Sequence, residues 1–224
     1  QANHTWNFDD GSPTVNTVNP IHTYATPGVY NVCLKSVNPA GTSEMCKKIS
    51  IEGVSRIHPK EGGNTGDVTM HINGGGFDND FKVRLIKNGT VIKEVNAILK
   101  NSGTLAANFD LRGTEEGPVD VEIAKPGGPN YRIQNGFNIA KGSKPDTWAR
   151  LTGRNRILKN TFTTYNVEVG NNGNVDATVV PFYIMVKNTN DIELKIEQSL
   201  FFNIEDDGNE ESGPEYTIVN IKTD

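Results

Sequence analysis

Acidic residues gather in three short segments that could bind a cation through their side-chain oxygens. The first is Asp9-Asp10, the second is Asp78-Asn79-Asp80, and the third covers residues 205–211. Calcium takes six to eight oxygen ligands, so oxygen-rich loops of this kind suit it. None of the three fits the EF-hand loop pattern. The plainer interpretation is a solvated acidic loop, in which Asp10 accepts hydrogen bonds from the amides of a turn.

Residues that usually build a catalytic centre are not spaced for one in this chain. It contains four histidines, none in an H-x-x-x-H or H-x-H pair: His4, His22, His58 and His71. No G-x-S-x-G motif surrounds a serine, and Ser12 follows Asp10-Gly11 as a turn residue. The glycine run at 74–76 lacks the lysine of a phosphate-binding loop and predicts a sharp strand turn. A glycosidase-like carboxylate pair stays open, although a narrow β-sandwich offers it no obvious cleft. We therefore predict that this segment is not an enzyme.

The two cysteines, Cys33 and Cys46, fall in one predicted β-hairpin. Its strands are expected at residues 30–37 and 42–51, around a loop rich in turn-forming residues. A four-residue loop places the cysteines directly opposite each other, close enough for a disulfide in a non-hydrogen-bonded pair. A three-residue loop with a bulge at Gly41 would shift the register by one and weaken that pairing. The alternative is two buried free thiols, the usual state of cytosolic cysteines. We predict the disulfide, and the absence of CxxC spacing argues against zinc.

A few aromatic residues could form a platform that stacks against sugar rings. Trp148 is the main candidate for ligand binding, and it lies near the expected junction between two parts of the chain. It could equally pack that junction, so both interpretations are kept. The other members of this set are Tyr131, Phe201 and Phe202.

Composition predicts the kind of fold that must position these residues. The 224 residues include 23 glycines and 11 prolines, and only 35% are hydrophobic. Short apolar runs alternate with turn-forming clusters, which is typical of an all-β protein. No stretch of about 18 apolar residues predicts a membrane span. The net charge of −5 argues against nucleic acid and anionic membranes as partners. The first residue is Gln1 and no signal peptide is present, which suggests an internal piece of a longer precursor.

Residues 1–52 contain two motifs that occur together in a known family. Residues 6–12 read WNFDDGS, and residues 22–32 read HTYATPGVYNV. They resemble W-D-F-G-D-G-S and H-x-Y-x-x-x-G-x-Y-x-V of the PKD (polycystic kidney disease) domain, an immunoglobulin-like β-sandwich of secreted and cell-surface proteins. The chain departs from this pattern at Asn7 and Asp9.

The resemblance implies a core position for Trp6 and a structural role for His22. It favours calcium at Asp9 and Asp10 over the other acidic segments, because some PKD modules bind calcium; no other cofactor is expected. The remaining core candidates are Ile21, Tyr24, Val29, Tyr30, Val32 and Leu34. The strands that precede Trp6 in that family are absent here. Either the fragment was cut there, or another chain supplies the sheet edge, which predicts edge-strand association through the first module.

Residues 53–140 resemble a second immunoglobulin-like sandwich, the IPT/TIG domain. Counterparts of I-x-P-x-x-G, I-x-G-x-x-F, V-x-V-x-x-P-G-G and N-G-F-x-I begin at Ile57, Ile72, Val121 and Asn135. Ile123 occupies a place where valine is usual. Alternation of apolar residues through 119–123 predicts a half-buried strand.

Residues 141–224 are expected to form a third module after a polar linker at 141–146. Strands are expected at 163–169, 175–186, 192–204 and 216–221. Residues 165–177 contain Asn171, Gly173 and Ala177 in the spacing N-x-G-x-x-x-A, which is similar to a turn of CARDB-type adhesion modules.

The sequence therefore predicts an all-β chain of tandem immunoglobulin-like β-sandwich modules at 1–52, 53–140 and 141–224. The order of modules resembles large surface proteins of the Bacteroidetes type. The function that this implies is a non-enzymatic spacer or adhesion rod of a large secreted or surface-anchored bacterial protein, with protein or glycan partners. The alternative is an accessory, glycan- or protein-binding region of a secreted polymer-degrading enzyme. A DNA-binding IPT module of the transcription-factor kind is a weaker third idea, which the acidic charge and the predicted disulfide oppose.

Overall fold

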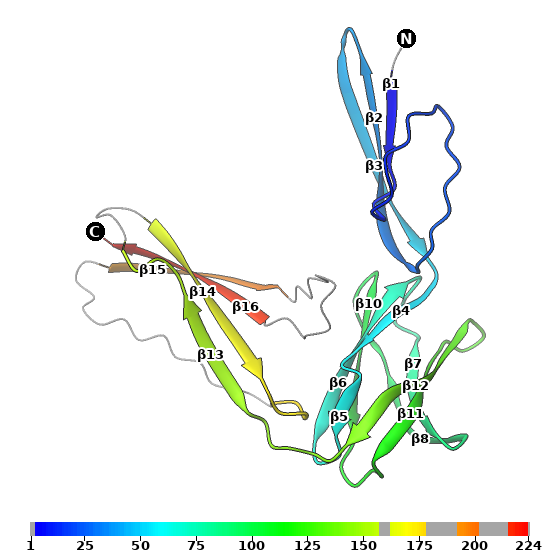
Figure 1. Cartoon of the computed structure of the whole chain (residues 1–224), viewed down its shortest axis with the longest axis vertical. Coiled ribbons are helices and arrows are strands. Elements are labelled where there is room, and N and C mark those ends of the chain that lie inside the picture. Colours follow the sequence, from blue (N-terminus) through cyan, green and yellow to red (C-terminus); the bar gives the residue numbers. More distant parts are fainter. Residues whose placement is uncertain (1–2, 157–161, 178–191, 202–214, 224) are drawn as a thin grey trace. The chain divides into compact units, whose positions relative to one another are not determined.

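The computed structural model describes residues 3–156, 162–177, 192–201 and 215–223. The chain divides into two compact units, residues 1–141 and 142–224, which are described separately. Every named element in these described ranges is a β-strand, so the chain is all-β as predicted (Figure 1). Within these ranges, the structure contains no helix that is long and apolar enough to cross a membrane.

The first unit begins with a three-stranded antiparallel sheet in the order β1-β2-β3 (Figure 1, blue). Its strands are β1 (Asn3–Asn7), β2 (Gly28–Asn38) and β3 (Gly41–Ile51). β2 and β3 are joined by a tight turn in which the Asn38 side chain accepts hydrogen bonds from the amides of Ala40 and Gly41, at 2.9 and 3.1 Å. This loop is shorter than the predicted four residues, but the register is the predicted one, with Cys33 opposite Cys46.

The segment between β1 and β2 differs from its prediction. Residues 22–25 form no strand, and the proposed core residue Ile21 is 97% exposed. His22 and Tyr24 instead hold the segment to the sheet through side-chain hydrogen bonds and ring contacts. Neighbouring side chains on an extended chain point in opposite directions, so Ile21 faces solvent once its neighbour His22 faces the sheet.

The rest of the first unit is an immunoglobulin-like β-sandwich of two facing sheets. One sheet has the order β4-β6-β10-β9 and the other the order β5-β12-β11-β7-β8. The pairings are antiparallel except for β5 with β12. The strands are β4 (Gly53–His58), β5 (Glu61–Gly63), β6 (Asp67–Gly75), β7 (Lys82–Lys87), β8 (Thr90–Asn96), β9 (Ile98–Asn101), β10 (Thr104–Asp110), β11 (Gly117–Ala124) and β12 (Asn130–Ala140).

An apolar core fills the space between these two sheets. The alternation predicted for residues 119–123 is confirmed, since Val119, Val121 and Ile123 are all buried on β11. The largest fully buried side chains in this core are Phe81, Phe109, Phe137, Met70, Ile72, Leu85, Leu105 and Leu111.

Glycines form the contact between the first sheet and the sandwich. A Cβ on Gly75 would lie 2.4 Å from the carbonyl oxygen of Ile51 and 2.5 Å from that of Gly28, so only glycine fits there. The next residue, Gly76, has φ of 76° and donates its amide hydrogen to the Ser50 hydroxyl at 2.6 Å. The predicted turn at this glycine run is confirmed. The domain boundary expected near residue 52 stays a prediction.

The second unit contains a four-stranded antiparallel sheet in the order β13-β14-β16-β15. Its strands are β13 (Thr147–Thr152), β14 (Phe162–Asn171), β15 (Ile192–Phe201) and β16 (Glu215–Thr223). Residues 175–177 of the strand expected at 175–186 are not in a strand, because they belong to the turn that follows β14. The remainder of that predicted strand, Phe202 and the acidic segment 205–211 lie outside the described residues.

Candidate functional site

Asp10 lies at the centre of a hydrogen-bonded turn that follows β1. Its Oδ1 accepts hydrogen bonds from the Ser12 amide at 3.1 Å and the Ser12 hydroxyl at 2.5 Å, and its Oδ2 lies 2.7 Å from Nε2 of His22. The Ser12 hydroxyl is the main cause that lowers the pKa of Asp10 to about 2, with His22 adding to it against partial desolvation. The motif residues Asp10, Ser12 and His22 therefore tie the loop to the turn.

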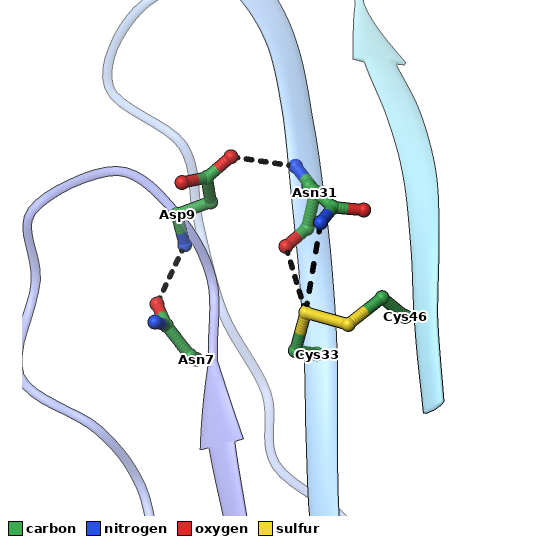
Figure 2. Close-up of a disulfide and its surroundings, with 5 residues drawn as sticks. All are labelled: Asn7, Asp9, Asn31, Cys33 and Cys46. Carbon is green, nitrogen blue, oxygen red and sulfur yellow. Dashed lines mark hydrogen bonds between the residues drawn. A yellow bond between two sulfur atoms is a disulfide. The ribbon is translucent and has the colours of Figure 1, made fainter. Parts of the chain in front are cut away.

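Asp9 makes a second set of contacts in the same turn (Figure 2). It adopts a left-handed backbone, with φ of 61°, and donates its amide hydrogen to Oδ1 of Asn7 at 2.9 Å. Its Oδ2 accepts the backbone amide of Asn31, 22 residues along the chain, at 2.8 Å. The carboxylates of both predicted calcium ligands, Asp9 and Asp10, therefore accept hydrogen bonds from other groups of the protein. Calcium at Asp9 and Asp10 stays a prediction.

Cys33 and Cys46 form the predicted disulfide, which links β2 to β3 (Figure 2). Their Cα atoms are 4.1 Å apart, close to the spacing of a non-hydrogen-bonded antiparallel pair. Oxidised cysteines offer no thiolate to a metal. Stable disulfides are typical of oxidising, extracellular compartments.

An aromatic stack lies on one face of the first sheet. The rings of Phe8 and His22 are parallel, with centroids 3.9 Å apart, and Tyr24 meets His22 edge-on at 4.7 Å. Trp6 lies parallel to Phe8 at 6.4 Å and donates from Nε1 to the carbonyl of Thr17 at 3.0 Å. The Tyr24 hydroxyl donates to the carbonyl of Phe8, and burial raises the pKa of Tyr24. These contacts explain why the two motifs occur together.

Beside this stack, the same face of the sheet forms an apolar groove of about 440 Å³. Strand β3 contributes Met45, which is 76% exposed. The groove is therefore open to solvent, and it is lined by Trp6, Phe8, His22, Tyr24, Val32, Leu34, Met45, Cys46, Lys47 and Ile49.

Met45, Lys47 and Asn31 were not among the sequence-based candidates. Once Cys33 is opposite Cys46, Met45 must lie opposite Leu34, on the apolar face. The hairpin register could therefore have revealed the groove. No sequence signal pairs Asp9 with Asn31, because that contact depends on the path of the loop between them.

Trp148 lies on β13 and packs within the second unit. A Cβ on Gly170 would lie 2.5 Å from its ring, and its Nε1 donates to Oδ1 of Asn172 at 3.1 Å. Arg150 stands 5.9 Å from the ring centroid in a cation–π contact. Glycan binding by Trp148 stays a prediction.

The turn after β14 explains the asparagine and glycine of the N-x-G-x-x-x-A spacing. The Asn171 carboxamide accepts the amides of Asp146 and Gly173, both at 2.9 Å, and donates to the carbonyl of Val175 at 2.8 Å. These bonds hold the expected linker against the turn within the second unit. Tyr131 lies on β12 in the first unit, where it packs against the sandwich core.

The second acidic segment is also bonded to protein groups. Asp78 accepts hydrogen bonds from the Lys125 ammonium and the Asp80 amide, and Lys125 is the main cause that lowers the pKa of Asp78. Burial lowers the pKa of His58. The contacts of Asp78 link its loop to Lys125 of the sandwich.

Comparison with known proteins identifies one family. Residues 1–52 match the PKD domain family, which covers less than a quarter of the chain. No curated protein matches the chain. The resemblances of residues 53–140 to IPT/TIG domains and of residues 141–224 to CARDB modules stay predictions.

Several solved structures are similar to the whole chain at low identity. SGBP-B of the Bacteroides ovatus mixed-linkage glucan utilization locus, in complex with a mixed-linkage heptasaccharide, is 14% identical, with a TM-score of 0.29. The match covers 99% of this chain and 51% of that one, so the chain spans about half its length. A three-Ig structure of titin domains is 12% identical, with coverage of 100% and 78% and a TM-score of 0.26. Surface layer protein SbsC is 14% identical, with coverage of 88% and 31% and a TM-score of 0.28.

Proposed function

We propose that this chain is a non-enzymatic binding and spacing segment of a secreted or surface-anchored bacterial protein, with protein or glycan ligands. The observation that carries the proposal is the open apolar groove on the first sheet, with Met45 76% exposed at its side. Contiguous apolar surface that stays exposed marks an interaction site more often than scattered single residues do. The Cys33–Cys46 disulfide supports an extracellular location, where such bonds persist.

The contacts of the motif residues support the non-enzymatic part of the proposal. Asp10 accepts the Ser12 amide and lies within hydrogen-bond distance of His22. Asp9 accepts the Asn31 amide of β2. A general base must be free to reach a proton on a substrate, whereas here the carboxylates hold backbone amides and a histidine.

Two modes of binding are compatible with this surface. A ligand can occupy the groove, or a strand from another chain can pair with the free edge of the first sheet. The immunoglobulin-like sandwich then serves as a scaffold that positions the first sheet. The IPT/TIG and CARDB-like character of the later modules is part of this proposal, as is their role as spacers.

A binding screen tests the groove. The chain is assayed against immobilised polysaccharides and extracellular proteins, together with Met45→Glu, which places a charge in the groove. Val91→Glu is the matched control, because Val91 is 48% exposed on β8 of the sandwich. We expect Met45→Glu to abolish binding and Val91→Glu to leave it intact. Equal binding by both variants would show that the groove is not the site.

A second assay tests the absence of catalysis. We expect no turnover of peptide, ester or glycoside substrates. Turnover that a single carboxylate or serine substitution abolishes would overturn the non-enzymatic assignment.

A further inference from the structure

Strand β3 is the outer strand of the first sheet, and its free edge is long. It is 11 residues long, and every residue from Gly41 to Lys48 is exposed. β2 is its only strand partner among the described residues. An edge of this length presents a row of amide and carbonyl groups that a further strand can pair with.

The contacts of β2 show which residues of β3 direct their backbone groups to that edge. The Asn31 amide donates to Asp9, on the β1 side of β2. Odd-numbered residues of β2 therefore bond toward β1, and even-numbered residues bond toward β3. Their partners on β3, such as Met45 opposite Leu34, are odd-numbered. The even-numbered residues Glu44, Cys46 and Lys48 thus point their amides and carbonyls outward.

A second copy of the chain can pair with this edge in only a few registers. In a two-fold antiparallel pair, residues whose backbone groups point outward must lie opposite each other. The sequence numbers of two opposed residues therefore add up to an even sum. Centring the pair on Glu44, Lys47 or Lys48 places like charges opposite each other. Centring it on Met45 places no pair of oppositely charged residues across from each other. Centring it on Cys46 places Glu44 opposite Lys48 twice, once on each side of the axis.

The other face of the sheet favours the same register. With Cys46 at the centre, Met45 lies opposite Lys47 of the second copy, on the side of the groove. The methylene stem of a lysine can cover an apolar side chain while its ammonium stays in water. Lys47 of each copy would thus cover Met45 of the other copy, which is 76% exposed in the single chain.

We propose that two copies of this chain associate by antiparallel pairing of their β3 edges, centred on Cys46, over residues 43–49. Just beyond these residues, the Ser50 hydroxyl accepts the Gly76 amide, so β3 there contacts the sandwich. The pairing would join two three-stranded sheets into one continuous sheet. This inference rests on the proposed role of the first module as an interaction surface.

Light scattering across a concentration series gives the first test. We expect the measured mass to rise from that of one chain toward that of two as concentration increases. A mass of one chain at every concentration would overturn the proposal.

Charge reversal at the paired positions tests the register. Glu44→Lys and Lys48→Glu each place like charges opposite each other at two symmetry-related positions, so each should weaken association about tenfold or more. An equimolar mixture of the two variants restores both attractive pairs in trans, as does the double variant with itself. Glu116→Lys, an exposed residue beside β11, is the control with the same charge change and should associate like the wild type.

The mixture separates pairing between copies from an effect within one hairpin. Glu44 lies opposite Lys35 within the chain, so a purely local destabilisation would persist in the mixture. Failure of the mixture to associate while the wild type does would refute this register. A chain that stays monomeric but binds a ligand in the groove would refute self-pairing and leave the proposed function standing.

Discussion

The sandwich of strands β4–β12 and the sheet of strands β1–β3 belong to one compact unit, yet different interactions hold them together. In the sandwich, two sheets enclose a core whose central residues, such as Phe109 and Leu85, are at most 1% exposed. In residues 3–52, Phe8 is the only buried apolar side chain. There the described chain forms one sheet layer, and a loop covers part of its apolar face.

The two regions therefore differ in the kind of interaction that stabilises them. The sandwich is stabilised mainly by apolar area removed from water, which is non-directional. The first sheet relies on directional contacts instead, namely the disulfide, the ring stack and the hydrogen bonds of Asp9 and Asp10. The motif in residues 1–52 therefore consists of side chains whose hydrogen bonds and ring contacts fix the first sheet, whereas the sandwich depends mainly on apolar residues at the right spacing.

Truncating one core residue of the sandwich should have the largest effect. Phe109→Ala leaves a cavity between the two sheets and should lower the free energy of unfolding by about 3–5 kcal/mol. Urea unfolding followed by circular dichroism measures the loss. Hydrogen exchange of peptides from residues 53–141 shows that it arises in the sandwich.

Met45→Ala is the matched truncation in the first sheet. Because Met45 is 76% exposed, its removal should change the free energy of unfolding by less than about 0.5 kcal/mol in the single chain. A loss as large as that of Phe109→Ala would mean that the apolar face of the first sheet is buried in solution. The contrast between the two regions would then be wrong.

Removing the disulfide should affect only the first sheet. The double variant Cys33→Ser/Cys46→Ser opens a loop of about 14 residues, which in the chain-entropy model costs about 3 kcal/mol. We expect faster hydrogen exchange in peptides from β2 and β3, with exchange in residues 53–141 unchanged. Equal acceleration in the sandwich would show that the two regions unfold as one cooperative unit.

The disulfide was predictable because it depends on local geometry. A short turn between two strands fixes the register, and either a four-residue or a two-residue loop leaves Cys33 opposite Cys46. The buried strand at residues 119–123 was predictable for a similar reason, since period-two alternation marks one buried face. In both cases the information lies within a short stretch of sequence.

The segment between β1 and β2 was not predictable in this way. Its conformation is set by contacts between residues far apart in sequence, such as Asp10 with His22 and Asp9 with Asn31. The apolar character of Ile21 suggested burial, but those contacts turn it to solvent. The open groove was missed because its lining comes from three separate strands and this loop.

Acid should loosen the first sheet through Asp10. The folded-state pKa of Asp10 is about 2, below the ordinary value of 3.8. A lowered carboxyl pKa stabilises the fold above the unfolded value, and this contribution is lost as pH falls from about 4 to about 2. The fluorescence of Trp6 reports the change in a Trp148→Phe background, because the chain has only two tryptophans.

Variants at the contacts of Asp10 sharpen this test, because they alter one cause of the shift at a time. The Ser12 hydroxyl lowers the pKa of Asp10 most and His22 also lowers it, so Ser12→Ala and His22→Gln should each move the onset of the Trp6 transition to higher pH. Asp10→Asn should remove the transition from this range. Asp120→Asn is the control: the Asn135 amide and then Arg132 lower the pKa of Asp120 in the sandwich, so the Trp6 signal should not respond to it. A response to Asp120→Asn equal to that of Asp10→Asn would show that acid unfolds both regions together, and that the polar turn is not a separate source of order in the first sheet.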